Sequence, residues 1–218
     1  MIYDVRHVTT YGYSRQVPFA RCIMRLLPRD GSGQSVQKSE LLITPRPAER
    51  NDTTCFFGNR MTMVTITKPH RELKVEMRAR LVVERPAPPH PGLTRGWEEV
   101  AALALASDSL APDSPAQHLY PSRLVPEVAP VIAYARESFG KARPVLEAAS
   151  ELMARIRRDF TYDPEATEVS TPLAEAFAQR HGVCQDFAHI MIAGLRGLGL
   201  PAAYVSGYIR TIPPPGQK

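Results

Sequence analysis

Alternating apolar and polar residues mark the first third of the chain as β structure. Over residues 73–81 the odd positions are apolar and the even positions are charged, which predicts a strand with one buried and one solvated face. Further strands are expected where β-branched and aromatic residues concentrate, at 2–11, 20–27, 39–44, 53–57 and 61–67. Many short strands at this spacing predict a β-sandwich over residues 1–85. Phe56 and Phe57 are expected in its core, and a contact surface is the alternative role for this apolar pair.

The pattern becomes helical after a proline-rich segment at residues 86–95. Proline fixes φ and lacks an N–H donor, so this segment is predicted to be a linker between two domains. Beyond it, apolar residues recur at three- and four-residue spacing. We expect helices at 97–106, 126–139, 145–160, 172–179 and 184–198, then a short strand at 202–210 and a loop at 212–218. The predicted fold class is therefore α+β, with a largely helical domain over residues 96–218.

Composition narrows the class of protein. A chain of 218 residues that is 44% hydrophobic can bury a sizeable core. It has neither an 18-residue apolar stretch nor a secretory signal at its start, so we expect a cytoplasmic protein without a membrane partner. The formal charge is +5, but the arginines are scattered, which argues against nucleic acid as a partner. The sequence does not indicate an oligomeric state.

The three cysteines, Cys22, Cys55 and Cys184, are widely spaced. They fit neither a disulfide framework nor paired zinc ligands, and we expect neither a metal nor a cofactor.

Cys184 is the best candidate for chemistry. It occupies the first turn of a helix whose apolar face predicts central burial; that face comprises Phe187, Ile190, Met191, Gly194, Leu195 and Leu198. Free amides and the helix dipole at such a position favour a thiolate over a thiol. Gly182 would let a substrate backbone approach the sulfur, and Asp186 is placed to cap the helix. A free cysteine can equally be a packing residue, and the residues alone support both interpretations.

A general base for Cys184 is harder to find. His189 follows five residues later and is rotated about 140° away around the helix, so it cannot be the base within that helix. His181 lies in the preceding loop, where its reach is unconstrained. The remaining histidines have no partner at ligand spacing and are expected at the surface or in packing; they are His7, His70, His90 and His118.

Several segments resemble a known family. Gly182-Val183-Cys184-Gln185-Asp186-Phe187-Ala188-His189, residues 195–202 and residues 205–208 resemble the bacterial transglutaminase-like core, and residues 3–11 with 27–29 resemble the β-rich region that precedes that core. The resemblance implies a papain-like core in which Cys184 is the nucleophile. Gly182, Val183, Gln185 and Asp186 become candidates for the oxyanion site or its surroundings.

The resemblance also implies a histidine and an aspartate on strands downstream of the one expected at 202–210. Residues 211–218, which follow that strand, contain neither a histidine nor an aspartate. We therefore expect both residues beyond Lys218, and a core that is incomplete at its C-terminus. The other interpretation is a degenerate, non-catalytic relative.

The function implied is a cysteine enzyme that acts on amide or peptide bonds of a protein or peptide through a Cys184 thioester, by hydrolysis or by acyl transfer. The alternative is a non-catalytic module that binds a peptide or protein. A redox-sensing thiol is a third possibility, but no resolving cysteine lies near Cys184 in sequence.

Overall fold

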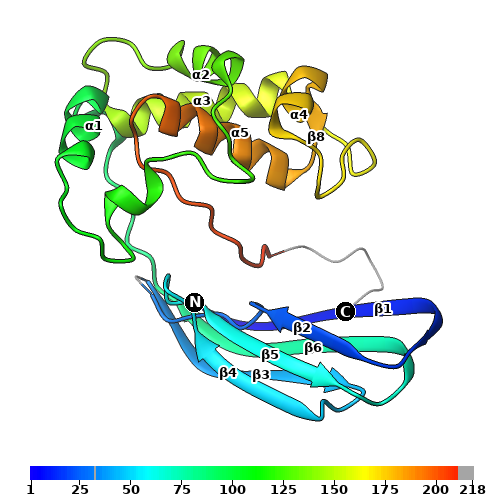
Figure 1. Cartoon of the computed structure of the whole chain (residues 1–218). Helices are drawn as coiled ribbons and strands as arrows, with labels where there is room; N and C mark the ends of the chain where they lie inside the picture. The colour runs from blue at the N-terminus through cyan, green and yellow to red at the C-terminus, as the bar shows by residue number, and fades with distance from the viewer. Residues whose placement is uncertain (32, 211–218) are drawn as a thin grey trace, which may run out of the picture. The chain divides into compact units, whose positions relative to one another are not determined.

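The chain forms two compact units. The computed structural model describes residues 1–31 and 33–210 (Figure 1). The first unit comprises Met1–Ala87 and a segment that starts at Ser206; the second comprises Pro88–Val205. The chain thus leaves the first unit within the predicted linker. One unit contains open sheets and the other is mainly helical, which confirms the α+β class.

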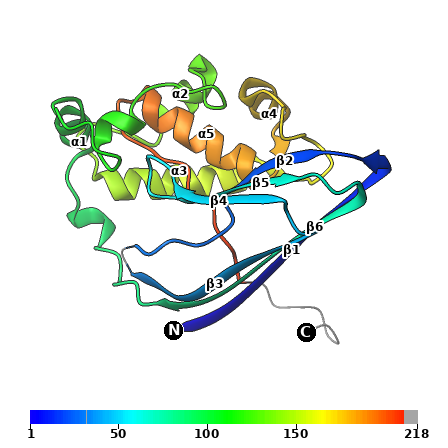
Figure 2. The same ribbon diagram turned by 60° about the horizontal axis from the view of Figure 1, so that its bottom comes forward.

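The first unit contains two three-stranded antiparallel sheets. One has the strand order β1 (Ile2–Val17), β6 (His70–Val83), β3 (Gln34–Thr44). The other has the order β2 (Ala20–Met24), β5 (Arg60–Ile66), β4 (Glu49–Thr54). Figure 2 shows the two sheets as separate layers.

A single apolar core lies between the two sheets. The inward residues of β6 are buried as their alternation predicts; they are Leu73, Val75, Met77, Ala79 and Leu81. They pack in one cluster with Ile66 of β5 and with Ala20, Cys22 and Met24 of β2. Because both sheets contribute their inner faces to this cluster, the unit is the predicted sandwich.

Glu76 breaks the alternation of β6. Its position predicts a solvated side chain, yet the residue is only 7% exposed. Arg6 and Arg78 each donate an Nε–H to its Oε1, at 2.8 and 2.7 Å. These two hydrogen bonds hold the pKa of Glu76 at about 2, below its ordinary 4.5, although burial acts in the opposite direction.

The strand predicted at 53–57 is wrong in position. The strand in this region is β4, which ends at Thr54. Residues 55–59 form the hairpin connection to β5. It is closed by hydrogen bonds from Cys55 N to Asn59 O and from Gly58 N to Cys55 O. Phe56 and Phe57 are 56% and 43% exposed, so their placement in the core is also wrong. Gly58 has a φ of 76°, a turn conformation that overrides the β propensity of its aromatic neighbours.

The second unit contains five α-helices: α1 (Trp97–Leu105), α2 (Ala129–Arg136), α3 (Val145–Asp159), α4 (Leu173–Gln179) and α5 (Cys184–Gly197). Two short 3-10 turns, η1 (Pro91–Leu93) and η2 (Pro115–His118), precede α2. Each predicted helix is present, with bounds that differ by at most three residues.

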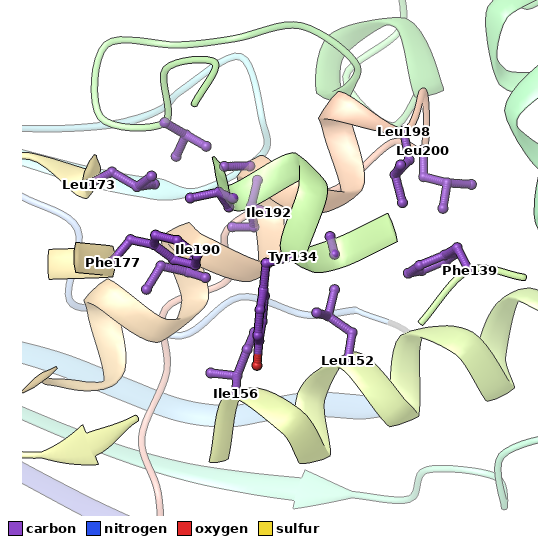
Figure 3. Packing of buried hydrophobic residues seen from close by; sticks show 14 of the residues in the cluster. Tyr134, Phe139, Leu152, Ile156, Leu173, Phe177, Ile190, Ile192, Leu198 and Leu200 are labelled. Carbon is purple, nitrogen blue, oxygen red and sulfur yellow. The ribbon is translucent and has the colours of Figure 1, made fainter. Parts of the chain in front are cut away.

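The central element of this unit is α5, which contacts α2, α3 and α4. Figure 3 shows Ile190 and Ile192 of α5 among the side chains of these neighbouring helices. On the predicted face, Ile190, Gly194 and Leu198 are buried. Ile192 and Ala193, which lie off that face, are buried as well. Hence α5 is enclosed on more sides than an amphipathic helix would be.

Close packing of α5 on α2 depends on a glycine. A Cβ at Gly194 would lie 2.6 Å from the Cβ of Ala135, well inside van der Waals contact. The two helices can therefore approach at this point only because the side chains are hydrogen and methyl.

The strand predicted at 202–210 is wrong. These residues have no regular secondary structure. Ala202 N donates to His118 O at 3.1 Å, and the Tyr208 hydroxyl donates to Leu26 O at 2.9 Å. Such isolated bonds are not a ladder, and none of the described strands pairs with these residues. The loop predicted at 212–218 lies outside the described residues.

The depressed pKa of Glu76 makes the first unit sensitive to acid. The folded unit takes up this proton only near pH 2, whereas the unfolded chain takes it up near 4.5. The stabilisation is therefore complete above about pH 4.5 and is lost as the pH falls towards 2. Protection factors of the β6 amides, measured by hydrogen exchange at several pH values, should fall over this range in the wild type.

In Glu76→Gln this fall should be much smaller, and the protection factors should already be reduced at neutral pH. Glu72→Gln, which changes an exposed carboxylate on the same strand, is the control and should follow the wild type. An unchanged pH dependence in Glu76→Gln would contradict the assignment.

Candidate active site

Cys184 is the first residue of α5, and its side chain is exposed. An α-helix leaves its first amides without a carbonyl partner inside the helix. Here these include the amides of Cys184 and Gln185, next to the thiol. The structure thus places an accessible sulfur beside free N–H donors at the positive end of the helix dipole, as the sequence predicts.

Asp186 fixes the start of this helix. The residue is only 5% exposed, and its Oδ2 accepts hydrogen bonds from Val183 N at 2.9 Å and from the Thr167 hydroxyl at 2.7 Å. The first bond satisfies the amide just before the helix, which is the capping role predicted for Asp186. The second ties the helix start to the loop ahead of α4. Thr167 was not foreseen, because it lies 19 residues away and carries no local signal.

Gly182 makes room for the Asp186 carboxylate. A Cβ at this position would lie 2.6 Å from Asp186 Oδ2 and 3.1 Å from its Cγ. Glycine is therefore required at this position to leave space for the carboxylate, which the sequence does not reveal. The predicted access for a substrate backbone is a separate role. Val183 and Gln185, the other two predicted near-site residues, flank Cys184 and are half-buried.

A short parallel pairing holds the segment before Cys184. β7 (Thr161–Tyr162) pairs with β8 (His181–Gly182). Thr161 N donates to Arg180 O at 2.8 Å, and Asp163 N donates to Gly182 O at 3.0 Å. These two bonds hold the segment before the thiol at Arg180 and at Gly182. Sequence reasoning missed this pairing because two-residue strands have no periodicity.

An aromatic cluster with two arginines supports the same segment. The guanidinium of Arg180 lies over the rings of Phe177, Phe160 and Tyr134, at 4.2, 4.6 and 5.1 Å from their centroids. That of Arg155 lies 4.3 Å from the Tyr134 centroid. Burial, together with the hydrogen bond that the Tyr134 hydroxyl donates to Asp159, raises the pKa of Tyr134 to about 12. Tyr134 therefore stays neutral and is not an acid or base near pH 7.

Neither nearby histidine forms a hydrogen bond with Cys184 in the described part of the chain. The ring of His189 lies 5.4 Å from that of Tyr204, and burial lowers its pKa, with the charge of Asp186 acting in the opposite direction. His181 is exposed, and its Nδ1 lies 2.7 Å from Gln179 O. This agrees with the exclusion of His189 as a base within the helix.

The other histidines are in packing or surface positions. His70 is buried against Tyr13, and His7 lies against Tyr208. His90 is exposed and accepts a hydrogen bond from Gly92 N.

The described residues contain neither a metal cluster nor a membrane-spanning helix. Residues 1–31 and 33–210 contain no group of three or more His, Cys, Asp or Glu side chains arranged to hold a metal ion. Nor do these residues form a helix that combines the length and the hydropathy needed to cross a bilayer. The absence of a cofactor and the cytoplasmic location remain predictions.

Comparison with known proteins decides the family. Residues 3–83 match the bacterial transglutaminase-like N-terminal region, and residues 132–214 match the transglutaminase-like superfamily. The chain belongs to the bacterial transglutaminase-like proteins. The second match contains all of α5, and with it Cys184 and the predicted residues around it.

Similar proteins occur in mycobacteria. Uncharacterized proteins of Mycobacterium bovis and Mycobacterium tuberculosis are each 37% identical to this transglutaminase-like chain over 216 residues, covering 99% of the chain and 68% of the relative. An uncharacterized protein of Mycobacterium leprae is 29% identical over 207 residues, covering 94% of the chain and 70% of the relative. The histidine and aspartate predicted beyond Lys218 remain a prediction.

A solved structure shares the fold. A "putative cysteine protease" from Cytophaga hutchinsonii superposes with a TM-score of 0.68 at 19% identity, covering 92% of this chain and 67% of the other. At this level of identity the likeness shows a shared fold and nothing further.

The contact between Gly182 and Asp186 gives a testable coupling. Asp186→Ala leaves the Val183 amide and the Thr167 hydroxyl without their acceptor, and should lower the free energy of unfolding of the second unit by about 1–3 kcal/mol. Gly182→Ala should also be destabilising, because its methyl group meets the carboxylate. Urea unfolding followed by the fluorescence of Trp97, which is in this unit, measures both.

The double variant distinguishes this contact from a general effect. With the carboxylate already removed, Gly182→Ala should cost clearly less than it does in the wild type, giving a coupling energy of about 0.5–3 kcal/mol. Strictly additive effects would show that Gly182 is needed for another reason.

Proposed function

We propose that Cys184 is the nucleophile of a cysteine enzyme that cleaves or transfers the acyl group of an amide in a protein or peptide. The proposal rests on one observation above all, an exposed thiol at the N-terminus of a buried helix. Cysteine sulfur is an effective nucleophile, and the exposed position of Cys184 leaves its sulfur open to a substrate. Membership in the transglutaminase-like family supports the same role.

The first chemical step forms a thioester. The Cys184 thiolate attacks the carbonyl carbon, and a C–S bond forms while the carbonyl oxygen becomes an oxyanion. The amides of Cys184 and Gln185 are the donors proposed to stabilise that oxyanion, since the helix does not use them. Gly182 and Val183 form the adjacent backbone, and Asp186 keeps it in place through the bond from Val183 N.

The second step regenerates the enzyme. The C–N bond of the tetrahedral intermediate breaks as the amine leaves with a proton, which we assign to the histidine expected beyond Lys218. Water then attacks the thioester to give an acid, or a primary amine attacks it to give a new amide. Both outcomes remain proposals.

A non-catalytic module that binds a peptide or protein is the second candidate. It is favoured by the histidine geometry, because neither His181 nor His189 is hydrogen-bonded to the thiol in the described residues. In that case the chain would use the same fold without turnover.

Acylation of Cys184 tests the first step directly. Incubation with 4-nitrophenyl acetate should transfer the acetyl group to sulfur and release 4-nitrophenolate. Peptide mass spectrometry should find Cys184 acetylated at least about tenfold faster than Cys22 or Cys55, because only Cys184 combines exposure with free helix amides. Cys184→Ala should abolish the rapid release of nitrophenolate while the Trp97 fluorescence stays native. Equal rates at the three cysteines would favour the binding module.

The choice of acceptor can be read in the same assay. If a primary amine resolves the thioester, a fluorescent alkylamine added with the ester should appear as its acetamide faster than in the Cys184→Ala control. Recovery of free Cys184 without labelled amide would instead indicate hydrolysis.

A further inference from the structure

Arg180 occupies a backbone conformation that normally selects glycine. It follows α4 directly and is left-handed, with φ 59° and ψ 21°. A Cβ is crowded in this region, so helices usually place glycine here. A glycine would allow the same turn at a lower conformational cost. The presence of arginine therefore suggests that its side chain contributes something that the turn alone does not need.

The half-buried Arg180 side chain packs against the aromatic core of the second unit. Its guanidinium lies over three rings, from α2, from the end of α3 and from α4; they are Tyr134, Phe160 and Phe177. Within residues 1–31 and 33–210 no carboxylate forms an ion pair with it, and its buried Nη1 has no hydrogen-bond partner. The aromatic faces, rather than an anion, therefore hold the group in place.

The Arg180 backbone begins the segment that carries the thiol. Its carbonyl accepts the hydrogen bond from Thr161 N that opens the β7–β8 pairing, and Cys184 follows four residues later. Between them, His181 is exposed and Gly182 has no side chain. Arg180 is thus the last long side chain before Cys184 that is fixed in the aromatic core.

We propose that Arg180 is a positioning residue. Its guanidinium packs on the aromatic cluster and thereby fixes β8. The position of β8 in turn sets the position of the Cys184 sulfur relative to the free amides of α5. This role rests on the proposed function of Cys184. It assigns Arg180 no contact with substrate. The expectation follows from the geometric sensitivity of attack on a carbonyl, where a displacement of about 1 Å can cost about 100-fold in rate.

Three substitutions separate the side chain from the turn. Arg180→Gly removes the guanidinium and relieves the backbone, Arg180→Ala removes it and keeps the crowded backbone, and Arg180→Lys keeps the charge but loses the planar group. Acetylation of Cys184 by 4-nitrophenyl acetate should slow by about tenfold or more in the Gly and Ala variants, with partial rescue in Lys. Rates at Cys22 and Cys55 serve as internal references.

A variant that weakens the same unit elsewhere controls for a general effect of destabilisation. Arg157→Gly removes an exposed arginine from α3, where glycine weakens a helix without touching the rings. It should leave the Cys184 rate at the wild-type value under conditions where Trp97 fluorescence shows every variant folded. An Arg180→Gly protein that reacts as fast as the wild type would overturn the positioning role.

Amide hydrogen exchange tests the positioning role of Arg180 even if wild-type Cys184 is unreactive. The amides of Thr161, Asp163 and Val183 report directly on β8 and the start of α5. Faster exchange at these amides in Arg180→Gly but not in Arg157→Gly, with an inert Cys184, would show that Arg180 holds the segment while the proposed function fails. Unchanged exchange would overturn the positioning role itself.

Discussion

The start of α5 depends on one buried carboxylate. Asp186 accepts hydrogen bonds from the Val183 amide and the Thr167 hydroxyl, and its oxygen occupies the space that a side chain at residue 182 would need. A carboxylate removed from water is tolerated only when donors replace its hydration. The three segments that meet at Asp186 are therefore held in one arrangement, and the position of Cys184 at the helix end follows from it.

Each unit contains a buried carboxylate, and different donors satisfy the two groups. Glu76 lies on a sheet face and is neutralised by two guanidinium groups, whereas Asp186 lies at a helix end and is satisfied by an amide and a hydroxyl. Cationic partners hold the pKa of Glu76 at about 2.

Cys184 is exposed at the end of a helix that is otherwise well packed. The helix α5 contacts α2, α3 and α4, and the aromatic cluster holds Arg180. The sulfur is exposed beside amides that the helix does not use. The transglutaminase-like match contains this helix, but a fold by itself does not specify a reaction, because one fold supports many functions.

The sequence by itself determined the class of fold, the helix that carries Cys184 and the cap role of Asp186, because these depend on local periodicity and on the position of a residue in its own helix. It could not determine what depends on distant residues. The exposed hairpin at Phe56 and Phe57, the unpaired segment at 202–210, and the contacts of Thr167 and Arg180 with the start of α5 and the aromatic cluster were decided by tertiary structure. Strand pairing and side-chain contacts across long separations leave no repeating pattern in the chain, so only the folded protein reveals them.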